Sequence, residues 1–175
     1  ADLVEVQLDG IRFILPRGYV QHYVFQEYEP ITRKMILDNL RPAMSFLDVG
    51  AHIGYYSLLA AKSVGVQGHV YAIEPADDNL DFLRRNVDLN QAGMVSVHPL
   101  AAGKSRGIRQ FHITESSDSD GFYPHPSAKT VHIVELEEVP LDEVIDGHVH
   151  AIKIDVEGAE LEVLQGMQRI LSDRP

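Results

Sequence analysis

The segment 46-FLDVGAHIGYYSLLAAK-62 predicts a short apolar strand, a turn that contains two glycines, and a helix, in that order. A strand that enters a helix through a glycine turn brings backbone N–H groups and the N-terminus of the helix to one point. The turn is therefore a candidate ligand site. Which ligand it suits depends on the positions of its glycines and on the residues that close the neighbouring strands.

Apolar runs alternate with amphipathic stretches on both sides of this segment. Strands are predicted at 44–50, 69–75, 94–100 and 150–158, and helices at 54–63, 77–90 and 159–171. The alternation predicts a doubly wound, Rossmann-like α/β sheet with parallel strands and helices on both faces. Two further β-rich runs, "GIRQFHI" and "VHIVELEEV", predict an inserted antiparallel pair joined by a long polar loop.

The N-terminal part predicts a β-hairpin, since residues 3–15 alternate apolar and polar around Asp9–Gly10. A helix follows Pro30 and ends before Pro42. A chain of 175 residues suits one domain, with an N-terminal hairpin region at 1–27 and a ligand-binding core at 28–175.

Composition narrows the classes of partner. The formal net charge of −11 argues against a nucleic-acid partner, since the only basic clusters are Arg84–Arg85 and Arg106/Arg109, and it favours a neutral or cationic small molecule. No apolar run is long enough to span a membrane. Because the chain has no cysteine, a disulfide framework and a thiolate metal site are excluded, and a cytoplasmic location is expected. The histidines and acids show no metal-ligand spacing, so no metal is expected.

The turn itself lacks the pattern of a dinucleotide site. Gly50 and Gly54 are present, but His52 and Tyr55 stand where that fingerprint requires glycine, so a pyrophosphate would meet side chains. Glu74 closes the next strand and is spaced to accept hydrogen bonds from ribose hydroxyls, with little packing to lose. S-adenosylmethionine, which has a ribose and an adenine but no phosphate, fits better than NAD. The alternative is that the glycines only allow close packing and the acids are solvated strand ends.

Three stretches carry a resemblance to a known family: "FLDVGAHIGYYSL" (46–58), "VYAIEPADDNLDFLRRNVDLN" (70–90) and "IKIDVEGAELEVLQGM" (152–167). In this order they resemble the successive motifs of the FkbM family of S-adenosylmethionine-dependent methyltransferases. The resemblance runs from about residue 28 to 175 and implies a class I methyltransferase fold. It further implies S-adenosylmethionine as cofactor and O-methylation of a hydroxyl on a small secondary metabolite or sugar.

The resemblance also assigns a cofactor site by motif. It implies that the glycine turn and the acid before it line the methionine end of the cofactor, that Glu74 binds the ribose, and that the segment after the third strand lines the adenine. The residues so assigned are Asp48, Gly50, Ala51, His52, Gly54, Glu74, Leu100 and Ala101.

The C-terminus departs from the family pattern, because similar members continue into further strands. The resemblance therefore predicts a C-terminally truncated sheet in which strand 150–158 has an open apolar edge. Such an edge favours a homo-oligomer. The missing strands also favour an alternative function, a non-catalytic or inactive adenosyl-binding module. A nicotinamide-dependent oxidoreductase is a third possibility, which the two non-glycine residues of the turn disfavour.

Methyl transfer to an oxygen requires the acceptor to be aligned with the methyl donor and usually a group that takes the hydroxyl proton. Asp155 and Glu157 are candidates for this base, since they lie at the end of the predicted strand that is next to the first one. Lys153 lies on the same side of that strand and can pair with one of them. In the alternative reading, Asp155 accepts N–H bonds of the turn and Glu157 caps the following helix.

Aromatic side chains supply a candidate wall for the substrate: Tyr55, Tyr56, Phe122 and Tyr123. One of the two adjacent tyrosines is expected to lie in the core instead. Gln26, Tyr28 and Glu29 are placed to form a lid over the cofactor, and His52 and His125 are placed to reach a ligand.

Overall fold

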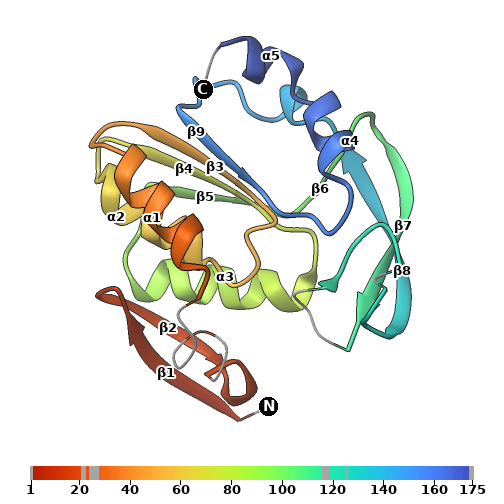
Figure 1. Ribbon diagram of the computed structural model, residues 1–175, viewed down its shortest axis with the longest axis horizontal. Helices are drawn as coiled ribbons and strands as arrows, with labels where there is room; N and C mark the ends of the chain where they lie inside the picture. The colour runs from red at the N-terminus through yellow and green to blue at the C-terminus, as the bar shows by residue number, and fades with distance from the viewer. Residues whose placement is uncertain (1, 21–22, 24–27, 116–118, 125, 174–175) are drawn as a thin grey trace.

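The computed structural model describes residues 2–20, 23, 28–115, 119–124 and 126–173 (Figure 1), so that Gln26 and His125 lie outside the described residues. The strands are β1 (Leu3–Leu8), β2 (Ile11–Pro16), β3 (Ser45–Val49), β4 (His69–Ile73), β5 (Val95–His98), β6 (Ala101–Ala102), β7 (Gly107–Thr114), β8 (Thr130–Val139) and β9 (Ala151–Ile154). The helices are α1 (Pro30–Asn39), α2 (Tyr55–Val64), α3 (Asp77–Leu89), α4 (Glu160–Gln165) and α5 (Gln168–Ser172). Within these described ranges, no helix combines the length and the apolar character that crossing a bilayer requires.

The central sheet has the strand order β5-β4-β3-β9, and its neighbouring strands are all parallel. From β3 the chain moves outward through β4 and β5 and then returns to the other side of β3 as β9. The strand order therefore reverses beside β3, which is where open α/β sheets bind their ligands. The predicted doubly wound parallel sheet is confirmed.

Helices cover both faces of this sheet. Successive residues of β3 point to opposite faces, so they pack against different helices. Phe46 packs in the cluster of buried side chains that includes α1, α2 and α3. Leu47 and Val49 pack in a second cluster, with α4, α5 and the 3₁₀ helix Leu141–Glu143. Figure 1 shows α1 to α3 on one side of the sheet and α4 and α5 on the other.

The predicted N-terminal hairpin is also present. Asp9 and Gly10 have φ values of 52° and 74°, as a two-residue turn of type I′ requires. Phe13 is fully buried, and the backbone N–H of Ile14 donates to the side-chain oxygen of Asn86 on α3 at 2.7 Å. The side-chain amide of Asn86 thereby helps to hold a two-stranded sheet, which would be marginally stable by itself.

The inserted antiparallel pair is β7 and β8, which form a separate sheet with β6. The insert stands beyond the end of the central sheet (Figure 1). Gly121, in the connection between β7 and β8, exchanges backbone hydrogen bonds with His112 at 2.8 and 3.1 Å. A Cβ on Gly121 would lie 3.2 Å from the Cβ of Glu157. This part of the connection therefore packs against the residues that follow β9.

One predicted element is wrong, because the helix expected at 159–171 consists of two short helices, α4 and α5. A Cβ on Gly166, between them, would lie 1.9 Å from the backbone oxygen of Gly103. The carboxylate of Asp142 accepts hydrogen bonds from two backbone N–H groups in α5, at 2.7 and 3.0 Å. The apolar periodicity of the sequence continues through this break and does not reveal it. The break is caused by the backbone of Gly103 and the carboxylate of Asp142, which belong to other parts of the chain.

Candidate active site

A cavity opens at the carboxyl ends of the central strands, where the strand order reverses, and encloses about 820 Å³ including open solvent at its mouth. Most of the residues predicted from the sequence line it: Gly50, Ala51, His52, Glu74, Leu100, Ala101, Lys153, Asp155 and Glu157. Two of them, Asp48 and Gly54, lie outside the lining.

The glycine turn is pressed against the end of β9. Gly50 has a φ of 78°, and a Cβ there would lie 1.8 Å from the backbone oxygen of Asp155, so no other residue fits. Its N–H donates to the carbonyl of Ile73 at 3.0 Å, which fixes the turn to β4 as well. At Gly54 (φ 90°) a Cβ would meet Leu83 of α3 at 2.6 Å. Gly54 therefore allows close helix packing and does not contact the cavity.

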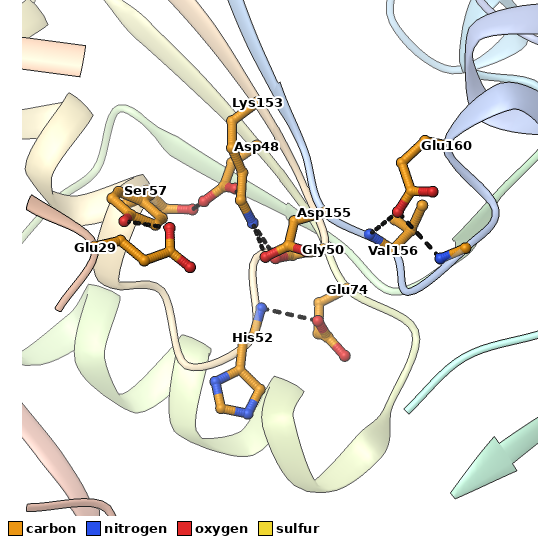
Figure 2. A network of polar contacts seen from close by, with 12 residues as sticks. Glu29, Asp48, Gly50, His52, Ser57, Glu74, Lys153, Asp155, Val156 and Glu160 are labelled. Atoms are coloured by element: carbon orange, nitrogen blue, oxygen red, sulfur yellow. Dashed lines mark hydrogen bonds and ion pairs between the residues drawn. The ribbon is translucent and has the colours of Figure 1, made fainter. Parts of the chain in front are cut away.

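Glu74 already accepts three hydrogen bonds, and Figure 2 shows the one from His52. Its Oε2 accepts from the N–H of His52 at 2.8 Å, and its Oε1 accepts from the N–H of Ala76 at 3.0 Å and from the amide of Asn79 at 3.2 Å. Burial raises the pKa of Glu74, and these hydrogen bonds oppose the rise. A carboxylate has about four lone-pair positions, so roughly one remains for a ligand hydroxyl.

This environment corrects the expectation that Glu74 has little packing to lose. The residue is 4% exposed, and its removal would leave three N–H groups without their acceptor. Glu74 therefore holds the glycine turn and the start of α3 in place, besides facing the cavity.

Lys153 joins the two strands that flank the reversal point (Figure 2). Its Nζ donates to the carbonyl of Gly50 at 2.8 Å and lies 3.4 Å from Oδ1 of Asp48 and 3.6 Å from Oδ2 of Asp155. Asp48 is fully buried, with Oδ2 accepting from the hydroxyl of Ser57 at 2.6 Å. Burial raises the pKa of Asp48, while Lys153 and Ser57 oppose the rise. Asp48 thus anchors a lysine that lines the cavity.

The turn after β9 shows which acid caps the chain. Glu157 and Gly158 have φ values of 52° and 99°, and Oε1 of Glu160 accepts from the N–H groups of Val156 and Gly158 at 3.3 and 3.1 Å. Glu160, rather than Asp155 or Glu157, therefore satisfies these donors, while Asp155 and Glu157 line the cavity. The sequence signal for this role is an acid in the first turn of a helix.

Tyrosines form one wall of the cavity. Both Tyr55 and Tyr56 are buried, although the sequence predicts this for one of them, and both still line the cavity. The hydroxyl of Tyr55 donates to Asp9 at 2.9 Å and that of Tyr56 to Glu29 at 2.8 Å. Burial raises the pKa of Tyr55 to about 12. Tyr28, expected in a lid, lines the cavity edge-on to Tyr55 with ring centroids 5.3 Å apart.

Several lining residues are missing from the sequence-based site, among them Tyr23, Asn79, Phe111 and Asp120. Tyr23 stands in a stretch without periodicity, and its hydroxyl lies 2.9 Å from Nδ1 of His52. Of the two loop aromatics predicted to contact the substrate, Phe122 lines the cavity, whereas the hydroxyl of Tyr123 donates to Glu162 at 3.1 Å, outside the lining.

Residues 48–175 match the profile of the methyltransferase FkbM domain, which is well over half of the chain. The chain belongs to the FkbM methyltransferase family. Among similar sequences is the hexuronic acid methyltransferase AglP of Haloferax volcanii, which is 28% identical in an alignment 176 residues long that covers 88% of this chain and 67% of AglP. Methyltransferase 1 of Beauveria bassiana is 24% identical in an alignment 178 residues long, which covers 81% of this chain and 68% of the relative.

The crystal structure of a methyltransferase FkbM from Methylobacillus flagellatus KT superposes with a TM-score of 0.50 at 27% identity. The match covers 81% of this chain and 37% of that one. The predicted class I methyltransferase fold is therefore confirmed. The chain spans about two thirds of the two curated relatives and little more than a third of the solved FkbM protein.

Proposed function

We propose that this FkbM-family chain binds S-adenosylmethionine and methylates a hydroxyl oxygen of a small molecule, either a sugar or a secondary metabolite. One observation carries the proposal. The glycine turn, the acceptor Glu74 and the Lys153–Asp155 pair meet in one cavity at the reversal point of the sheet. The hydroxyl-bearing substrate named for AglP is consistent with this class of acceptor.

The cavity walls fit the parts of such a cofactor. Glu74 has an acceptor position left for a ribose hydroxyl, and Leu100 and Ala101 offer a small apolar surface to an adenine. Phe122 packs in the same buried cluster as Ala101, which extends that surface. Gly50 brings the turn directly against the backbone of Asp155, because it has no Cβ, and so places the cofactor half of the cavity next to the end of β9. When bound, S-adenosylmethionine supplies an electrophilic methyl group.

The acceptor half of the site lies at the end of β9. Asp155 accepts the hydrogen bond of an incoming hydroxyl and takes its proton as the oxygen reacts. Lys153 orients that carboxylate from 3.6 Å and holds it beside the Gly50 turn, so that the acceptor is aligned with the cofactor. Glu157 supplies a second acceptor for neighbouring hydroxyls of the substrate. These paired acids favour catalysis over the alternative of a non-catalytic adenosyl-binding module.

We also propose that residues 1–175 act as one domain, in which the hairpin region (1–27) completes the core (28–175). Ile11, Phe13 and Leu15 of β2 support this assignment, because they share a buried cluster with α2 and α3.

The test of the cofactor site is Glu74→Gln. This change keeps an oxygen for two of the three present donors but places an amide N–H where Oε2 accepts from His52 and from the ligand. A hydrogen bond to a charged group contributes about 1.5–3 kcal/mol, so calorimetry should show roughly ten- to a hundred-fold weaker binding of S-adenosylmethionine and of S-adenosylhomocysteine.

The matched control is Glu135→Gln, because Glu135 is exposed on the insert. Circular dichroism establishes that both variants are folded at the temperature of the titration. Equal affinities for the parent and Glu74→Gln would remove the ribose role of Glu74. A folded parent chain that binds neither ligand would refute the cofactor assignment itself.

A further inference from the structure

The cavity is strongly acidic. Its described lining residues include four carboxylates, Glu74, Asp120, Asp155 and Glu157, and one lysine, Lys153, which gives a formal charge of −3 with His52 counted as neutral. A fifth carboxylate lies just behind the wall, since Glu29 accepts a hydrogen bond from Tyr56 at 2.8 Å. The cavity therefore presents a negative potential to whatever enters it.

The lysine of the cavity is occupied by the protein. Lys153 contacts the carbonyl of Gly50 at 2.8 Å and the carboxylates of Asp48 and Asp155 at 3.4 and 3.6 Å. A ligand carboxylate that recruited Lys153 would take it away from Asp48, a fully buried acid. Leaving a buried charge without its partner is costly, so Lys153 is a poor receptor for an acidic ligand.

Arg109 does not serve as a receptor either. Its guanidinium lies over the ring of Phe122 at 4.1 Å, but Arg109 is not part of the cavity lining. Its Nη1 is 2.6 Å from Oε2 of Glu162 and 3.4 Å from Oε1 of Glu138. These contacts fasten the insert to α4. Among the described lining residues, the remaining cationic candidate is His52, which bonds to Tyr23 and lies on the glycine turn, in the half of the cavity assigned to the cofactor.

We propose, on the basis of the function proposed above, that the methyl acceptor is a neutral sugar or an amino sugar, and that the cavity rejects acceptors that carry a carboxylate. S-adenosylmethionine carries a net charge of +1 at neutral pH, from a sulfonium and an ammonium against one carboxylate. It offsets only part of the charge of the lining, so an acidic acceptor would meet net repulsion in a site less polar than water. The acceptor class named for AglP, a hexuronic acid, therefore does not extend to this chain.

Three probes that share one ring test this inference: methyl β-glucopyranoside, the corresponding 2-amino-2-deoxyglucoside, and the corresponding glucuronide. Their dissociation constants are measured by NMR titration on the protein saturated with S-adenosylhomocysteine. The glucuronide is expected to bind at least tenfold more weakly than the neutral glucoside, and the amino sugar equally or more tightly. Added salt should narrow the difference, because it screens charge repulsion.

Glu157→Gln should reduce the ratio of the glucuronide and glucoside dissociation constants about threefold, since it removes one lining charge. The exposed control Glu135→Gln should leave this ratio unchanged. A glucuronide that binds as tightly as the glucoside would overturn the proposal, and so would a failure of all three sugars to bind to the loaded protein. A chain that does not bind S-adenosylhomocysteine would instead refute the proposed function, and the two failures are thus distinguishable.

Discussion

Replacing Lys153 with methionine should destabilise the fold in a way that depends on pH. Methionine preserves most of the aliphatic stem, so packing between β9 and β3 is largely retained. The loss is the ammonium group, 3.4 Å from a buried oxygen of Asp48 that has no hydrogen-bond partner among the described residues. The side chain of Lys153 is 12% exposed, and that of Asp48 is 0% exposed, so water replaces little of what is removed.

The expected cost is about 3–5 kcal/mol of unfolding free energy at pH 8, the usual range when one partner of a buried ion pair is removed. This is a large part of the roughly 5–15 kcal/mol that stabilises an ordinary domain. Burial already raises the pKa of Asp48, and Lys153 is the largest opposing influence, so the variant should raise it further. An acid whose pKa is raised by folding binds a proton more tightly in the native state. Its penalty is therefore small at low pH and grows as the pH rises through the native pKa.

Urea denaturation of the parent and of Lys153→Met at pH 5 and pH 8 measures the cost of the substitution and its pH dependence. The difference in unfolding free energy between the two proteins should be smaller at pH 5 than at pH 8. The double variant Asp48→Asn/Lys153→Met should be more stable at pH 8 than Lys153→Met alone, because the buried charge is gone. A coupling free energy of about 2 kcal/mol is expected between the substitutions at Asp48 and Lys153, because the two side chains are in contact. A cost below about 1 kcal/mol at pH 8, or additive effects in the double variant, would refute the reasoning.

Two further substitutions test the frame around the site. Gly50→Ala should lower the unfolding free energy by about 2–5 kcal/mol, because the left-handed φ and the contact with Asp155 both penalise a Cβ. The control Gly93→Ala, which has no atom near its Cβ, should change the unfolding free energy by less than about 0.5 kcal/mol. Equal urea midpoints for the two variants would contradict this prediction. Hydrogen bonds from Arg33 lower the pKa of Asp9, so the carboxylate stabilises the fold above its unfolded pKa of about 3.9, and the contribution is lost as the pH falls through the lower native value. Asp9→Asn should therefore cost up to about 1 kcal/mol at pH 7 and less at pH 2.5, and a cost that does not change with pH would argue against the ion pair.

The parts of the fold that the sequence predicts are those with local causes. Apolar periodicity determines where β3, β4 and β9 lie, and Asp9–Gly10 specifies the hairpin turn by itself. The order of strands and helices then places Gly50 and Glu74 at one edge of the sheet, so most of the cavity lining is predictable from the chain.

The errors concern contacts between segments that are distant in sequence. The break at Gly166 depends on a backbone and a carboxylate from other elements. The burial of Glu74 depends on α3 and on the glycine turn, and Tyr23 reaches the cavity from a stretch with no pattern. A short apolar or acidic motif specifies its own secondary structure but not which distant group will contact it.

The insert leaves and re-enters the central fold at nearly the same place. Ala101 and Ala102 of β6 pair with Glu138 and Val139 of β8, so the two ends of the segment between them lie side by side. When the ends of a segment are already held together, a change in its length alters the entropy of closure only logarithmically. Insertions and deletions in this segment therefore have little effect on the sheet, while they reshape the cavity wall that Phe122 and Asp120 provide. Proteins that evolve from this fold can therefore change their substrate while the strands that hold Gly50 and Glu74 stay the same.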